Sequence, residues 1–138
     1  MLKVAFATDN RVDVNQHFGS TRGFAIYALD AERSQLVGVS EFPEDAMDGN
    51  EDKLVARIQA LAGCAAVYCL AAGASAVRQL LAQGVQPLRL DTHRAIESLL
   101  AELGRAVRDG GVPWIDKVLR RDTDSGRFDR MAEEGWQE

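Results

Sequence analysis

Several features that would place a protein at once in a large functional class are missing from this chain of 138 residues. No apolar run approaches the roughly 18 residues that a membrane-spanning helix needs. The first residues do not combine a charged region with a long apolar one, so we expect no secretory signal peptide. The 2 cysteines are too few for a disulfide framework in a chain of this size. These absences favour a cytoplasmic protein with reduced thiols and no membrane partner.

The chain also lacks an excess of positive charge and the standard catalytic motifs. Its net charge is −5, whereas affinity for nucleic acid rests largely on neutralising phosphates, so we expect no nucleic-acid partner. The glycine patterns GxGxxG and GxxxxGKS/T are missing, as are GxSxG and HExxH. Neither CxxC nor the four-ligand spacing of a structural zinc site occurs. None of the common enzyme classes is therefore indicated.

What is present is the composition of one globular domain, with 46% hydrophobic and 27% charged residues. Five apolar segments predict strands. Leu2–Ala7 is apolar on both faces, as in a central strand. Residues 8–22 are predicted as a loop, and Gly23–Leu29 and Gln35–Phe42 as an antiparallel hairpin whose second strand lies at an edge of the sheet. The last two strands are 65–70 and 85–90, and Pro87 favours an edge position for the latter.

Apolar residues at helical spacing predict three helices in the second half of the chain. The stripes are Leu54, Val55, Ile58, Leu61 and Ala62; Val77, Leu80 and Leu81; and Ile96, Leu99, Leu100 and Leu103. Asp91 or Thr92 is expected to cap the third helix, and Gly104 to end it. The order β-β-β-α-β-α-β-α requires parallel, right-handed crossovers in its second half. We therefore predict an α/β fold: a mixed five-stranded sheet flanked by helices.

A C-terminal helical appendage is expected after Gly110 and Gly111. Pro113 suits a first helical turn, and Trp114 and Ile115 could face the core. We accordingly divide the chain into an α/β domain, residues 1–106, and a helical, charged tail, residues 107–138.

Soft metal ligands are scarce, and three of them fall at corresponding places. His17 follows the first strand, Cys69 ends the fourth, and His93 follows the fifth. If these strands run parallel, all three residues lie at the carboxyl edge of the sheet, where open α/β sheets bind their ligands. We therefore regard them as candidate metal ligands. The alternative interpretations are a solvated loop residue for His17, a core thiol for Cys69 and a helix-start residue for His93.

The second cysteine, Cys64, lies at the other end of the fourth strand. At ~3.3 Å per residue the two cysteines are roughly 16 Å apart, too far for a disulfide. Their odd spacing places them on opposite faces of the sheet, so Cys64 is expected to be a small buried hydrophobe.

The segment Ala71–Ser75 joins the fourth strand to a helix start. Small residues such as Gly73 and Ser75 let a ligand approach the backbone, and a helix N-terminus favours an anion. Close packing of the helix on the strand explains the same residues equally well.

A rival site uses carboxylates. Asp9, Asp13 and His17 share one loop and could bind a divalent metal in a hydrolase. Asp residues are also common turn formers, so a solvated loop is the alternative.

Five segments together resemble one protein family. They are Val14–Ser20 (VNQHFGS), Phe24–Tyr27, Gly49–Leu54, Gly63–Cys69 and Gly73–Val77. With His-Phe-Gly in the loop after the first strand, residues 2–103 resemble the dinitrogenase iron–molybdenum cofactor biosynthesis family. The resemblance implies a ribonuclease H-like fold without nuclease activity. It implies a carrier, not an enzyme, that binds and transfers iron–sulfur precursors of the iron–molybdenum cofactor.

The resemblance also implies partners and a site. The partners would be the assembly enzyme that makes the precursor and the scaffold proteins that mature it. The cofactor-binding residues that we expect are His17, Phe18, Gly19, Cys69, Gly73 and Ser75. Thiolate and imidazole suit iron, and the arginines assigned near the same edge, Arg11, Arg22, Arg78 and Arg94, would offset the negative net charge locally. A regulatory module that carries no cluster is a further alternative.

Overall fold

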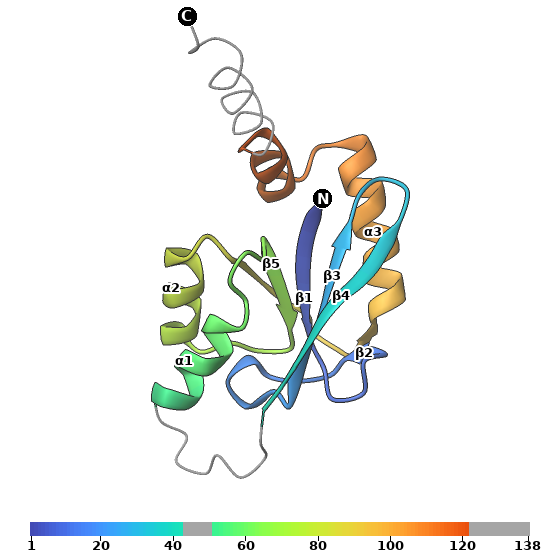
Figure 1. The fold of residues 1–138 in the computed structure, drawn as a ribbon. Helices are drawn as coiled ribbons and strands as arrows, with labels where there is room; N and C mark the ends of the chain where they lie inside the picture. The colour runs from blue at the N-terminus through green and yellow to red at the C-terminus, as the bar shows by residue number, and fades with distance from the viewer. Residues whose placement is uncertain (43–50, 122–138) are drawn as a thin grey trace, which may run out of the picture.

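A computed structural model describes residues 1–42 and 51–121, with the backbone alone for residues 51–53. Its five-stranded sheet has the order β4-β3-β1-β5-β6 (Figure 1). The strands are β1 (Leu2–Ala7), β3 (Gly23–Leu29), β4 (Ser34–Glu41), β5 (Ala66–Cys69) and β6 (Gln86–Arg89). β1, β5 and β6 are parallel, whereas β3 is antiparallel to both β1 and β4. The mixed sheet, its central first strand and its two predicted edge strands are confirmed.

Helices cover both faces of the sheet. α1 (Glu51–Gln59) and α2 (Ala74–Ala82) lie on one face, and α3 (Ile96–Asp109) lies on the other (Figure 1). The alternation along β1 creates two cores: Ala5 and Ala7 pack under α1 and α2, whereas Leu2, Val4 and Phe6 pack under α3. No helix in the described ranges is long and apolar enough to cross a membrane.

The predicted helical stripes are only partly correct. Val55 and Leu81 are 41% and 53% exposed, whereas Ala76, which the predicted stripe does not include, is buried. The expected cap of the third helix is also wrong, because Ala95 is its N-cap residue and makes no side-chain cap bond. The helix continues past Gly104 and ends at Asp109, and its C-cap residue Gly110 has a φ of 74° that suits glycine.

The predicted loop 8–22 contains two short elements. β2 (Asp13–Val14) pairs with β7 (Arg94–Ala95) in a small antiparallel ladder, and η1 (Phe18–Ser20) is a single 3-10 turn. The sequence pattern is too short to predict either element. The ladder ties the loop after β1 to the start of α3.

Part of the predicted C-terminal tail packs on the domain. Residues 113–121 are helical, and Ile115 is 1% exposed within the core under α3. The rest of the predicted tail, residues 122–138, lies outside the described residues.

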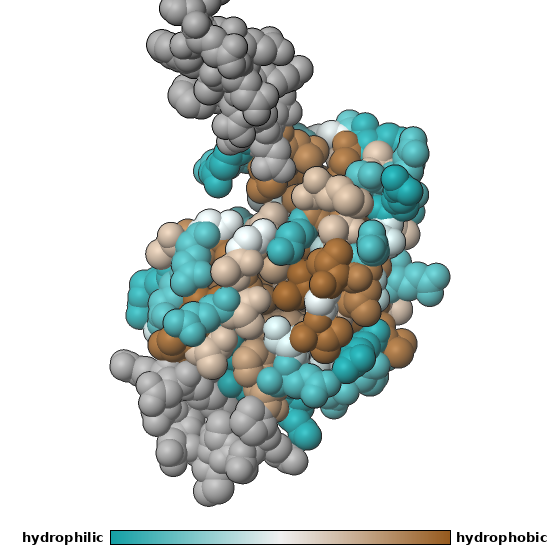
Figure 2. Space-filling model, in the orientation of Figure 1, coloured by the Kyte–Doolittle hydropathy of each residue, from teal (hydrophilic) through white to brown (hydrophobic). Residues whose placement is uncertain are grey.

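The edge strand β4 is the one part of the sheet with large exposed apolar side chains. Leu36, Val37 and Val39 are 45%, 48% and 37% exposed, and Figure 2 shows hydrophobic residues gathered over this strand. A register shift between Ile26 and Tyr27 opposite them marks a β-bulge, which commonly protects an open edge from pairing with another chain.

Candidate functional site

Three loops meet at the carboxyl edge, the edge at which the parallel strands β1, β5 and β6 end. They carry His17, the segment Ala71–Ser75, and His93 respectively. The sequence prediction that these loops share one edge is therefore confirmed. The side chains on them, however, are presented very differently.

His17 is exposed and lies directly beside the loop that follows β5. The residues on either side of it are both bonded to that loop. The Leu70 N–H donates to the carbonyl of Gln16 at 2.9 Å, and the Phe18 N–H donates to the carbonyl of Ala71 at 2.7 Å. The backbone on both sides of His17 is thus held by the loop that follows β5, while the His17 side chain is exposed.

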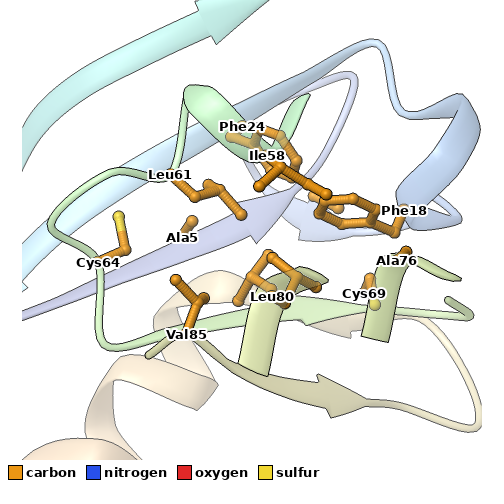
Figure 3. Close-up of a cluster of buried hydrophobic side chains, with 12 residues drawn as sticks. Ala5, Phe18, Phe24, Ile58, Leu61, Cys64, Cys69, Ala76, Leu80 and Val85 are labelled. Atoms are coloured by element: carbon orange, nitrogen blue, oxygen red, sulfur yellow. The ribbon is translucent and has the colours of Figure 1, made fainter. Parts of the chain in front are cut away.

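Phe18 anchors this arrangement. Its side chain is 0% exposed and lies over the end of β5 near Cys69 and Ala76 (Figure 3). Its ring centroid is 5.6 Å from that of Phe24. Because the buried Phe18 side chain fixes the backbone next to it, the exposed imidazole of His17 is held in place at the surface.

The first half of the loop is shaped by its own polar side chains. The Thr8 hydroxyl accepts from the backbone N–H groups of Asn10 and Arg11, and the side-chain Oδ1 of Asn10 accepts from those of Val12 and Asp13. Arg11 adopts a left-handed φ of 64° within these turns. These are the local bonds by which Asn, Asp and Thr form turns.

Asp9 and Asp13 do not form the metal site of a hydrolase with His17. The Asp9 carboxylate accepts a hydrogen bond from the Asn15 amide at 2.7 Å, and Asp13 belongs to β2. Within residues 1–42 and 51–121, no group of three His, Cys, Asp or Glu side chains could hold a metal ion. The same finding means that His17, Cys69 and His93 are not brought together as one ligand set.

Cys69 lies beneath the site. Its side chain is 0% exposed in the core under α1 and α2, and burial raises its pKa to about 11. A neutral thiol enclosed by apolar side chains is not presented to a ligand at the surface.

The predicted positions of the two cysteines need one correction. Cys64 lies in the turn before β5, and both cysteines belong to the same core, on the same face of the sheet (Figure 3). The expectation of opposite faces was wrong because it extended the strand by two residues. Both thiols are free, and Cys64 is buried as expected.

The loop between β5 and α2 offers backbone groups. Gly73 is the N-cap residue of α2, without a side-chain cap bond, and Ser75 is exposed in the first turn. A Cβ added to Gly73 or Gly19 would meet nothing within 4 Å, and neither glycine has a positive φ. The fold itself therefore requires glycine at neither position. Both leave open space next to the backbone of their own loops.

His93 is exposed on the side of the ladder between β2 and β7. It directly precedes β7, where Ala95 pairs with Asp13, and the Ile96 N–H donates to the carbonyl of Val12 at 2.8 Å. This places His93 next to α3, whereas Phe18 packs under α1 and α2 on the other face of the sheet. The two histidines therefore flank the carboxyl edge from different sides.

The arginines near this edge do not all contribute free positive charge. Arg11 pairs with Glu41 at 2.8 Å, and Arg94 pairs with Glu102. A cavity of about 240 Å³ next to the first pair is lined by Asp9, Arg11, Arg22 and Glu41 among others. The expected offset of the negative net charge is thus smaller than the number of arginines implies.

Sequence reasoning missed Arg57. Arg57 is not among the apolar residues of the stripe predicted on α1, yet its side chain is 3% exposed. Its Nη2 donates to the carbonyl of Thr21 at 2.7 Å, and its guanidinium lies 4.5 Å from the centroid of the Phe42 ring. Burial lowers the pKa of this guanidinium. No local pattern signals a buried arginine, because its partners come from other elements.

Comparison with known proteins gives a consistent result. The model of the family described as dinitrogenase iron-molybdenum cofactor matches residues 1–106. Protein NifX of Azotobacter vinelandii is 53% identical, covering 100% of this chain and 89% of that protein. Protein NifX of Klebsiella pneumoniae is 35% identical, covering 96% of this chain and 82% of that protein. The crystal structure of PH0822 shares the fold with a TM-score of 0.59 at 22% identity, covering 75% of this chain and 88% of the other.

Proposed function

The chain belongs to the dinitrogenase iron–molybdenum cofactor family, and on that premise we propose that it takes part in the biosynthesis of this cofactor as a carrier. In this role it binds an iron–sulfur precursor of the cofactor as cargo and passes it on without catalysing a reaction. The partners that we propose are the enzyme that assembles the precursor and the scaffold proteins that mature it. We propose that the protein works in the cytoplasm. We also propose that its architecture is ribonuclease H-like, with a C-terminal appendage.

One observation carries the proposal: the exposed imidazole of His17 stands on a backbone that hydrogen bonds and a buried side chain hold at the carboxyl edge. The flanking hydrogen bonds to Leu70 and Ala71 and the buried Phe18 hold it there. Imidazole is a suitable ligand for iron. Because no three-ligand group surrounds it within the described residues, a cluster bound there keeps other iron positions open. An open site of this kind allows release, which a carrier requires.

The neighbouring loop suits the charge and size of such a cargo. Iron–sulfur precursors are anionic, and the N-terminus of α2, beginning at Gly73 and Ala74, lies in the loop bonded to the residues around His17. Helix N-termini favour anions. The open space at Gly19 and Gly73 lets a bulky cluster approach the backbone. We therefore include Gly19, Gly73 and Ser75 in the proposed site.

Cys69 and His93 have secondary parts in this proposal. Cys69 supports Phe18 from below, and it becomes a ligand only in a state in which that packing opens. For His93, which precedes β7 on the far side of the edge, we propose a contact with the cargo.

The test is anaerobic loading of the parent protein and of His17→Ala with isolated precursor. Iron that stays with the protein after gel filtration is measured, together with its visible absorption. We expect retention by the parent and loss in the variant. A parent protein that stays colourless would refute the carrier function and would favour a regulatory module without a cluster. Equal retention by both proteins would move the site away from His17.

A further inference from the structure

Arg57 is a buried cation just beneath the carboxyl edge. It is 3% exposed on the inner face of α1. Replacing a buried charged group, even one whose partners satisfy it, by a well-packed apolar side chain of similar volume is often neutral or stabilising. Core stability alone therefore gives a poor reason for arginine at this position.

The partners of Arg57 lead directly to the proposed cargo contact. Its Nη2 donates to the carbonyl of Thr21 at 2.7 Å. The N–H of Thr21 in turn donates to the carbonyl of Phe18 at 3.5 Å, which closes the η1 turn, and Thr21 is 0% exposed. The N–H of Phe18 donates to Ala71. The turn that follows His17 is thus tied at one end to the β5 loop and at the other to α1.

A second contact fixes the guanidinium itself. It lies over the ring of Phe42 at 4.5 Å from the centroid, and Phe42 makes an edge contact with Phe24. The Phe42 N–H donates to the carbonyl of Arg22 at 2.9 Å, next to Thr21. A flat guanidinium can stack on an aromatic ring and donate in its own plane at once, which an ammonium cannot do.

We propose that Arg57 is a positioning residue for the cargo: by holding the carbonyl of Thr21 it sets the η1 turn, and thereby the orientation in which His17 meets the cluster. This inference rests on the proposed carrier function and adds to it a residue that does not touch the cargo. It also links α1 to the site, because a shift of α1 moves the turn that follows His17.

The experiment compares Arg57→Met, which keeps the length and removes the donors, with Arg57→Lys, which keeps the charge. Arg105→Met is the matched control, because Arg105 is exposed on α3 on the other face of the sheet. Each protein is loaded anaerobically with precursor, and the rate of iron loss to a chelator is measured well below its Tm. In parallel, the ring signals of His17 are recorded by NMR in the cargo-free proteins.

We expect Arg57→Met to lose iron about tenfold faster than the parent, equivalent to ~1.4 kcal/mol, and to shift the His17 ring signals. Arg57→Lys should recover only part of the retention, and Arg105→Met should match the parent. If Arg57→Met does not fold, Arg57→Lys and Phe42→Leu provide the same comparison.

Three results would overturn the inference: parent-like retention in Arg57→Met, unshifted His17 signals, or full recovery in Arg57→Lys, which would make charge and not geometry the cause. Failure of the parent to retain iron would instead refute the carrier function. The His17 signals would still show whether Arg57 sets the position of this side chain.

Discussion

Replacing Cys69 by alanine should change how the stability of the protein depends on pH. Burial raises the pKa of this thiol from 9.0 to about 11. As the pH rises, the Cys69 thiol therefore loses its proton at a lower pH in the unfolded chain than in the folded protein. The thiol's contribution is fully present below about pH 9 and is lost as the pH approaches about 11. Two pKa units correspond to roughly 3 kcal/mol of unfolding free energy, an order-of-magnitude value.

Urea unfolding of the parent and of Cys69→Ala between pH 8 and 11 measures this contribution. At pH 8 the variant should be less stable, because truncating a buried side chain leaves a cavity. The difference should shrink as the pH rises and the parent loses its advantage. Val67→Ala is the matched control, since Val67 is 0% exposed in the same core and on the same strand but does not ionise. Its difference from the parent should stay constant with pH.

A constant difference for Cys69→Ala across the same range would refute this reasoning. It would mean that the folded protein does not hold the thiol in its neutral form. Cys69 would then regain its place as a direct thiolate ligand of the cargo, as the strand pattern alone suggested. Cys64, whose pKa burial also raises, provides an internal comparison in the turn before β5.

Three further predictions concern the carboxyl edge. His17→Ala should leave the free energy of unfolding within about 0.5 kcal/mol of the parent by urea titration, because the side chain is exposed, while iron retention falls. Gly19→Ala should also unfold like the parent, since a Cβ meets nothing there; reduced iron retention would show that cargo approaches that backbone, and a Tm drop would contradict the geometry. Gly23→Ala should lower the free energy of unfolding by more than about 2 kcal/mol, because its Cβ would lie 2.5 Å from the Ser40 carbonyl oxygen; a parent-like denaturation curve would show that the β3–β4 pairing gives way easily.

Local patterns predicted most of the sheet. The alternation of Leu2, Val4 and Phe6 with the alanines between them indicated a strand covered on both faces, and the structure confirms two cores meeting at β1. Pro87 and the polar end of β4 indicated the two edges correctly. These features are predictable because they depend on side-chain period and on residues adjacent in sequence.

Helix faces were less well predicted. Leu81 continues an apolar stripe yet is 53% exposed, while Ala76 is buried. The spacing of apolar residues defines a broad face, but the neighbouring elements decide which part of that face is covered. The proposed site shows the same division. Its edge followed from strand order, whereas the enclosure of Cys69 followed from Phe18 folding back over β5.

The amino-acid sequence alone determined the α/β class, the parallel direction of the strands in the second half of the chain, and the loop in which His17 lies. Each of these depends on patterns of residues close together in the sequence. Only the tertiary structure decided that both cysteines share one core, that β2 pairs with β7, and that Arg57 reaches Thr21 from α1. Those contacts join residues far apart in the chain. Their formation depends on the volume left between packed elements, which no local pattern specifies.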